Sequence, residues 1–180
     1  MKQQLRQQTL NQLNMMSEEQ YAARSAALVQ QLLAHDCMKQ ANVIAVTMSA
    51  FPEVDTKPLI EALWQQGKRV AIPKCTPKTR DMHFYEIESF NGLKQTYGHL
   101  YEPNEQLHTY VAPEAIDVIV VPGVVYNKEG YRIGFGGGYY DRYLPKTNAY
   151  KIAMAFREQL QPSIPLEPHD CAVDTLLVER

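Results

Sequence analysis

A glycine-rich segment flanked by charged side chains is the part of this sequence best suited to chemistry. It reads Gly134-Phe135-Gly136-Gly137-Gly138, with Arg132 before it and Asp141-Arg142 after it. Glycines lack a Cβ, so their backbone N–H groups can approach phosphate oxygens closely, and neighbouring arginines balance the negative charge. A helix expected to start near Tyr139 adds the positive end of its dipole. The segment therefore predicts an anion-binding loop.

The spacing of the glycines fits neither common nucleotide motif. The segment lacks the G-x-x-x-x-G-K-[ST] of a P-loop, and Tyr139 stands where G-x-G-x-x-G requires its third glycine. Glycines alone also suit a tight loop that needs positive φ angles. Both interpretations stay open, and the arginines with Asp141 favour phosphate.

Other polar residues have two interpretations each. Lys2 and Arg6 are four residues apart, so a helix puts them on one face, which either binds an anion or is simply solvated. Glu53 either binds a ligand or caps a helix starting near Thr56. His169-Asp170 suggests a metal or acid–base pair, but no second histidine is near in sequence, which favours a polar loop.

Composition narrows the class of protein. The 180 residues carry a net charge of −2, with 45% hydrophobic and 21% charged residues, which is typical of one globular domain over residues 1–180 and gives no sign of nucleic-acid binding. The three cysteines are widely spaced and expected to be reduced. The longest apolar run, 118–125, is too short to cross a membrane and the first twenty residues are polar. We expect a cytoplasmic monomer.

Hydrophobic patterning predicts the elements that must position these residues. A β-branched run at 41–48, a helix at 56–66 and a strand at 68–73 ended by proline form a strand–helix–strand unit. Further strands are predicted at 82–87, 116–122 and 151–156, and a loop at 91–103. The first forty residues predict a helical hairpin, broken at Ser17, which with Gln20 resembles a capping box. The expected fold is α/β, a single three-layer domain with a mostly parallel central sheet flanked by helices.

The motifs together resemble one known family, the 5-formyltetrahydrofolate cyclo-ligases, also called methenyltetrahydrofolate synthetases. The match runs from Val121-Pro122-Gly123-Val124 through the segment 132–144. Lys2-Gln3-Gln4-Leu5-Arg6 resembles the family's N-terminal basic pair, Glu53-Val54-Asp55-Thr56 its folate-contacting turn, and Val173-Asp174 its closing acidic element. These landmarks cover nearly the whole chain in the expected order.

The resemblance implies that ATP and Mg²⁺ drive closure of 5-formyltetrahydrofolate to 5,10-methenyltetrahydrofolate, with release of ADP and phosphate. Phosphorylation turns the formyl oxygen into a good leaving group, and N10 of the same folate then attacks, so orientation is most of what the protein supplies. It implies folate contacts at Met48 and Glu53, and metal ligands at Asp141 and Asp174. The implied ATP-binding residues are Lys2, Gln3, Gln4, Leu5, Arg6, Arg132, Ile133, Gly134, Phe135, Gly136, Gly137, Gly138, Tyr139 and Tyr140.

The sequence departs from part of this family at the loop. Some members carry an arginine and a lysine where this chain has Phe135 and Gly137, so two catalytic positive charges are missing. The expected substitutes are Arg132 first, and Arg142 or Arg157 second.

Two other functions remain as alternatives. The glycine loop alone also suggests a nicotinamide-dependent oxidoreductase, against which stand Tyr139 and the lack of an acidic residue ending a second strand about 20 residues downstream. A folate-sequestering protein would bind 5-formyltetrahydrofolate without releasing ADP.

Overall fold

A central sheet of seven strands organises the computed structural model, which describes residues 1–96 and 101–180. The strand order is β11-β10-β7-β1-β2-β3-β6. Parallel pairing joins the first five in that order, and β3 and β6 close one edge as antiparallel strands. The sheet strands are β1 (Val43–Ala45), β2 (Arg69–Thr76), β3 (Asp81–Ile87), β6 (Thr109–Val111), β7 (Val118–Val120), β10 (Tyr150–Ala155) and β11 (Thr175–Val178).

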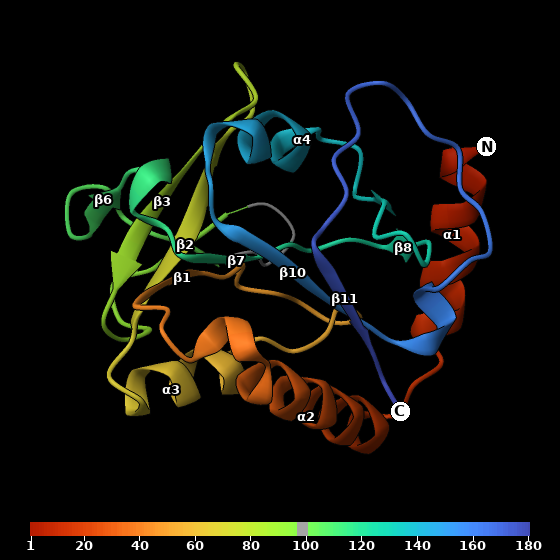
Figure 1. The fold of residues 1–180 in the computed structure, drawn as a ribbon, viewed down its shortest axis with the longest axis horizontal. Helices are drawn as coiled ribbons and strands as arrows, with labels where there is room; N and C mark the ends of the chain where they lie inside the picture. Colours follow the sequence, from red (N-terminus) through yellow and green to blue (C-terminus); the bar gives the residue numbers. More distant parts are fainter. Residues whose placement is uncertain (97–100) are drawn as a thin grey trace.

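Helices cover both faces of this sheet, which confirms the predicted α/β architecture with a mostly parallel sheet. Helices α2 (Glu18–Ala34) and α3 (Lys57–Gln65) lie on one face, and α4 (Tyr139–Tyr143) lies on the other (Figure 1). Two short ribbons complete the strands: β4 (Lys94–Gln95) with β5 (Tyr101–Glu102), and β8 (Val125–Tyr126) with β9 (Arg132–Ile133). The 3₁₀ turns are η1 (Asp36–Met38), η3 (Pro113–Ala115), η4 (Leu144–Lys146) and η5 (Arg157–Gln159).

Side chains that point alternately to the two faces of the sheet form two hydrophobic layers, one on each face. Ile44 and Val120 face the core beneath α2 and α3, whereas Ala45 and Ile119 face the core beneath α4. Successive side chains of a strand point to opposite faces, so a strand covered on both sides is apolar throughout. This explains why the strongest apolar runs of the sequence became the central strands.

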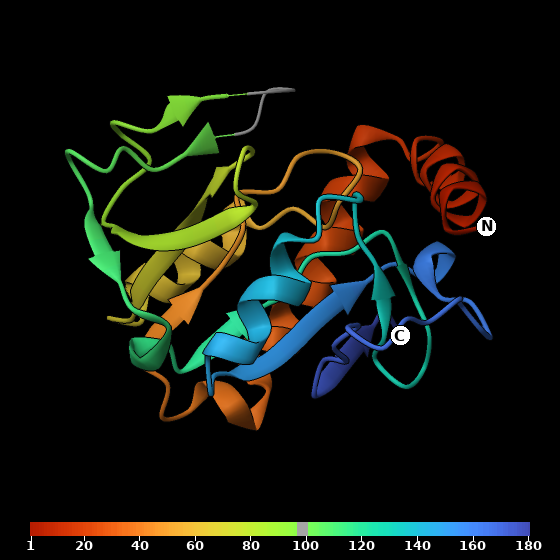
Figure 2. The same cartoon turned by 90° about the horizontal axis from the view of Figure 1, so that it is seen from above.

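The two N-terminal helices correct one prediction. The break at Ser17 and its capping box with Gln20 are confirmed, but α1 (Lys2–Leu13) does not fold back on α2 as a hairpin. It lies at the side of the molecule against β8 and η5, and α2 packs on α3, β10 and β11 (Figures 1 and 2). Leu5 and Leu10 attach α1 to a small separate core around Val125 and Ile133.

Strand β2 also runs further than predicted. Pro73 does not end it, because β1 pairs with β2 only as far as Ala71, and beyond that residue β2 pairs with β3 alone. A proline is tolerated where one side of a strand has no ladder partner. The predicted loop at 91–103 contains β4 and β5, and its residues 97–100 lie outside the described part of the chain.

Candidate functional site

The glycine-rich segment forms a tight connection between β9 and α4. Gly136 has φ 98° and Gly138 has φ 73°, in the left-handed region that side chains other than glycine rarely adopt. Gly138 is the N-cap of α4, which has only five residues. Phe135, within the loop, is 57% exposed. Because α4 is so short, its dipole attracts an anion only weakly, and the charged side chains around the loop would contribute more to anion binding.

Helix α1 brings Arg6 to this loop and Lys2 to the segment 167–170. Arg6 Nε donates to the carbonyl of Gly134 at 2.7 Å. Lys2 Nζ lies 3.0 Å from Glu167 Oε1 and 3.5 Å from Asp170 Oδ2. Gln3 and Gln4 are exposed, and Leu5 is partly buried against the small core. The first turns of α1 thus tie the loop to the segment before β11.

Arg132 is a buried side chain with fixed partners. Its guanidinium donates from Nε to the carbonyl of Pro122 at 2.9 Å and from Nη1 to Asp141 Oδ1 at 3.3 Å. It also lies over the ring of Tyr140, at 5.6 Å from the centroid. Only 5% of the Arg132 side chain and 20% of the Asp141 side chain are exposed. Arg132 therefore orients Asp141 and neutralises its charge.

The other two arginines suggested from sequence differ in position. Arg142 is exposed on the last turn of α4. Arg157 bonds through its side chain to the carbonyl of Arg180, so its charge is held at the C-terminus.

An acidic group stands next to the loop. Asp141, His169 and Asp170 each offer one side-chain atom that could ligate a metal ion, and these three atoms lie within 4.8 Å of one another. Asp141 Oδ1 also accepts from the backbone N–H of Cys171 at 3.4 Å, which ties the two segments together. The sequence interpretation of His169-Asp170 as a polar loop missed this grouping, because Asp141 lies about thirty residues earlier in the chain.

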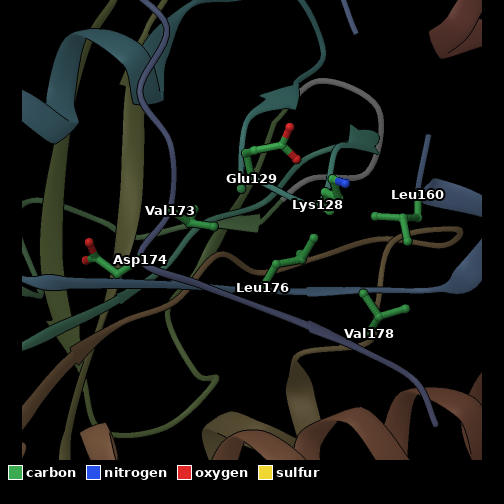
Figure 3. Close-up of a pocket in the computed structure, with 8 residues that line it drawn as sticks. Lys128, Glu129, Leu160, Val173, Asp174, Leu176 and Val178 are labelled. Carbon is green, nitrogen blue, oxygen red and sulfur yellow. The ribbon is translucent and has the colours of Figure 1, made fainter. Parts of the chain in front are cut away.

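Asp174 is not a member of this group. Its Oδ2 accepts from the backbone N–H of Lys151 at 2.8 Å, at the start of β10. Asp174 lines a pocket that lies between the turn at Lys128-Glu129 and strand β11 (Figure 3). The structure thus groups Asp141 with Asp170, and Asp174 is not among the three residues of that group.

A second pocket lies beside the loop at the carboxyl ends of β1 and β7, where ligands commonly bind in parallel sheets. Its volume is about 30 Å³, so a large ligand must displace side chains at its mouth. Glu53 lines it, whereas Met48 is 4% exposed in the main core and is not among its lining residues. The lining residues are Thr47, Ser49, Glu53, Val54, Thr56, Val120, Val121, Pro122, Gly123, Tyr126, Met154 and Gln159.

Glu53 is a carboxyl with little compensation for its burial. Its Oε2 accepts one long hydrogen bond, from the backbone N–H of Ala50 at 3.4 Å, and it has no ion-pair partner among residues 1–96 and 101–180. Burial raises the pKa of the Glu53 carboxyl to about 7. A ligand that donates hydrogen bonds here would complete its partners.

Residues on either side of the loop contact residues that line this pocket. The hydroxyl of Tyr140, just after the loop, lies 2.6 Å from that of Thr47, which lines the pocket. The Arg132 side chain donates a hydrogen bond to the carbonyl of Pro122, which also lines the pocket. A phosphate on the loop and an organic ligand at Glu53 would therefore be neighbours.

The sheet topology places the chain among α/β domains with a mostly parallel sheet, and solved structures have the same fold. An NMR structure of the 5,10-methenyltetrahydrofolate synthetase of Aquifex aeolicus superimposes with a TM-score of 0.87 at 31% identity, covering 99% of this chain and 90% of that one. A 5,10-methenyltetrahydrofolate synthetase from Mycoplasma pneumoniae gives a TM-score of 0.79 at 27% identity, over 98% and 97%.

The chain belongs to the 5-formyltetrahydrofolate cyclo-ligase family, whose model matches residues 1–179. The mouse 5-formyltetrahydrofolate cyclo-ligase is 31% identical over 97% of this chain and 92% of its own length. The Escherichia coli K12 enzyme of that name is 30% identical over 86% and 87%. This confirms the resemblance inferred from the motifs. None of the helices in the described part of the chain has the length and apolarity needed to cross a membrane.

Proposed function

We propose that this chain cyclises 5-formyltetrahydrofolate to 5,10-methenyltetrahydrofolate, using ATP and releasing ADP and phosphate. The observation that carries the proposal is that Arg132 and Tyr140, on either side of the glycine loop, contact residues that line the Glu53 pocket. The reaction needs a triphosphate and a folate in contact. Membership of the cyclo-ligase family supports it.

The chemistry would proceed in two steps. The formyl oxygen attacks the γ-phosphorus, the bond to ADP breaks, and the formyl carbon becomes electrophilic. N10 then forms a bond to that carbon and loses its proton, while phosphate leaves with the former formyl oxygen. N10 and N5, which carries the formyl group, belong to the same folate. Holding that folate in place would therefore contribute much of the rate enhancement.

Each part of the site would have its own task. The backbone of the loop, with Lys2 and Arg6 from α1, binds the phosphates. Glu53 accepts hydrogen bonds from the pterin ring, and its lack of strong partners in the structure supports this role. Arg132 orients Asp141 and closes the loop onto Pro122. The residues predicted to contact ATP and folate keep these roles as proposals.

The acidic group fits a divalent cation. Mg²⁺ binds through one or two carboxylates together with substrate phosphate oxygens, and Asp141 and Asp170 offer two carboxylates at the loop. We propose this pair in place of Asp141 and Asp174. When bound, the cation would neutralise charge on the transferring phosphate.

The proposal is tested by mixing the protein with ATP, Mg²⁺ and 5-formyltetrahydrofolate and following the near-ultraviolet absorbance of the methenyl product. We expect product that requires ATP. Folate binding without ADP release would identify a sequestering protein instead, and binding of NAD but not ATP would favour an oxidoreductase.

A further inference from the structure

One arginine beside the loop has no assigned role. Arg80 lies in the turn between β2 and β3, and its backbone N–H donates to the carbonyl of Thr76 at 2.8 Å. Its φ is 62°, the only positive φ of a non-glycine residue among residues 1–96 and 101–180. In that conformation the Cβ crowds the following carbonyl, so a glycine would suit the position better. An outlier of this kind calls for an explanation by function.

The side chain of Arg80 reaches the glycine loop. Its guanidinium carbon lies 5.8 Å from the centroid of the Tyr139 ring. A Cβ placed on Gly137 would lie 3.7 Å from Arg80 Nη1 and only 2.6 Å from Tyr139 Cε2. A side chain at 137 would therefore force the Tyr139 ring to move, and the same ring lies beneath the Arg80 guanidinium.

The guanidinium of Arg6 lies beside Gly136, as that of Arg80 lies beside Gly137. A Cβ on Gly136 would lie 3.8 Å from Arg6 Nη2. Two guanidinium groups from distant elements thus lie next to consecutive glycines. Arg132 already pairs with Asp141, whereas Arg80 forms no ion pair within the described ranges 1–96 and 101–180. Its charge is available to a ligand.

We propose that Arg80 binds the phosphate chain of ATP, and so provides positive charge from the β2–β3 turn beside Gly137. The inference rests on the proposed function for the identity of the nucleotide. A guanidinium presents several donors in a planar fork that matches phosphate oxygens. The contact with the Tyr139 ring, at 5.8 Å from its centroid, limits where this fork can lie and so reduces the entropy lost on binding.

The test compares R80G with K78Q by calorimetry, with magnesium tripolyphosphate and magnesium ATP as separate probes. Glycine keeps the turn because it accepts φ 62°, and Lys78 is an exposed cation on the same turn. We expect R80G to bind both probes about tenfold more weakly, with unchanged affinity for 5-formyltetrahydrofolate and a melting temperature no lower than that of the unmodified protein. R80K should retain part of the affinity, and K78Q should stay within twofold.

The idea is overturned if R80G binds both probes within twofold of the unmodified chain, or if K78Q loses as much as R80G, since the turn would then act only through its overall charge. Should R80G fail to fold, R80Q takes its place under the same criteria. Tripolyphosphate binding does not require folate turnover, so a chain that binds it through Arg80 but makes no methenyl product would reject the proposed reaction and keep this inference.

Discussion

Carboxylate oxygens of Asp141 and Asp170 lie within 4.8 Å of one another, whereas Asp174 accepts from the backbone of Lys151. Replacing each aspartate by asparagine therefore separates the two assignments of the metal ligands. Asparagine keeps an oxygen for the local backbone contacts and removes the charge. We expect D141N and D170N to raise the Mg²⁺ concentration that half-saturates turnover at least about tenfold, with folate affinity little changed. D174N should behave as the unmodified chain, because its partner is the backbone of Lys151. Equal effects of D174N and D141N would restore the assignment made from sequence.

Arg132 contributes to stability in addition to any part in catalysis. Its partner Asp141 is largely buried, so R132M leaves a carboxylate without its counter-charge. Removing one member of a buried ion pair costs about 3–5 kcal/mol in free energy of unfolding; the partial exposure of Asp141 favours the lower end. R142M, a change of the same kind at an exposed position, should cost under about 0.5 kcal/mol. Urea unfolding of both variants measures the difference, and similar losses would show that the pair contributes nothing.

Glu53 links folding to pH. Its pKa in the folded chain is about 7 against an ordinary value of 4.5, so between these values the folded state holds more protons than the unfolded state. Stability then falls as pH rises through this window. E53Q does not titrate and should lack this part of the slope, whereas E61Q, on the exposed side of α3, should keep it. Urea unfolding of the three proteins from pH 4.5 to 7 decides the matter, and parallel slopes for the unmodified chain and E53Q would exclude the effect.

At the scale of elements, α1 carries the basic residues of the site. It is attached through Leu5 and Leu10 to the small core around Ile133, next to the loop. L5S should loosen this attachment and raise the KM for ATP several-fold, because Lys2 and Arg6 lose their fixed position. Folate affinity should be unchanged, and Q8A, on an exposed position of the same helix, should have no effect. A rise in the folate dissociation constant equal to that for ATP would mean that α1 supports the whole domain.

The elements also show what the sequence can predict. Strands β1, β7 and β10 are apolar on both faces and the cap at Ser17 is a local motif, so both follow from short segments. The packing of α1 and the extension of β2 through Pro73 depend on partners distant in sequence. Lys2 and Arg6 are four residues apart, so sequence alone could pair them. Arg80 and Asp170 are distant from the loop in sequence, and only folding brings them close to it.

Over the whole molecule, the family was evident from ordered motifs, whereas the distribution of charge was not. The glycine loop 134–138 carries no charged side chain, and Arg6, Arg80 and Arg132 lie near it from three separate parts of the chain. In the proposed function, backbone and side chains would divide the binding of phosphate: the glycines would permit close approach, and remote arginines would provide charge. A monomeric state and a cytoplasmic location remain predictions.

The most direct test of the central claim uses 5-formyltetrahydrofolate labelled with ¹⁸O in the formyl group, together with ATP and Mg²⁺, in a single turnover. The account predicts methenyl absorbance that requires ATP, and phosphate that carries the ¹⁸O, because the formyl oxygen leaves with the transferred phosphoryl group. Mass spectrometry of the phosphate measures the label. Absence of the product, or product with unlabelled phosphate, would contradict the account.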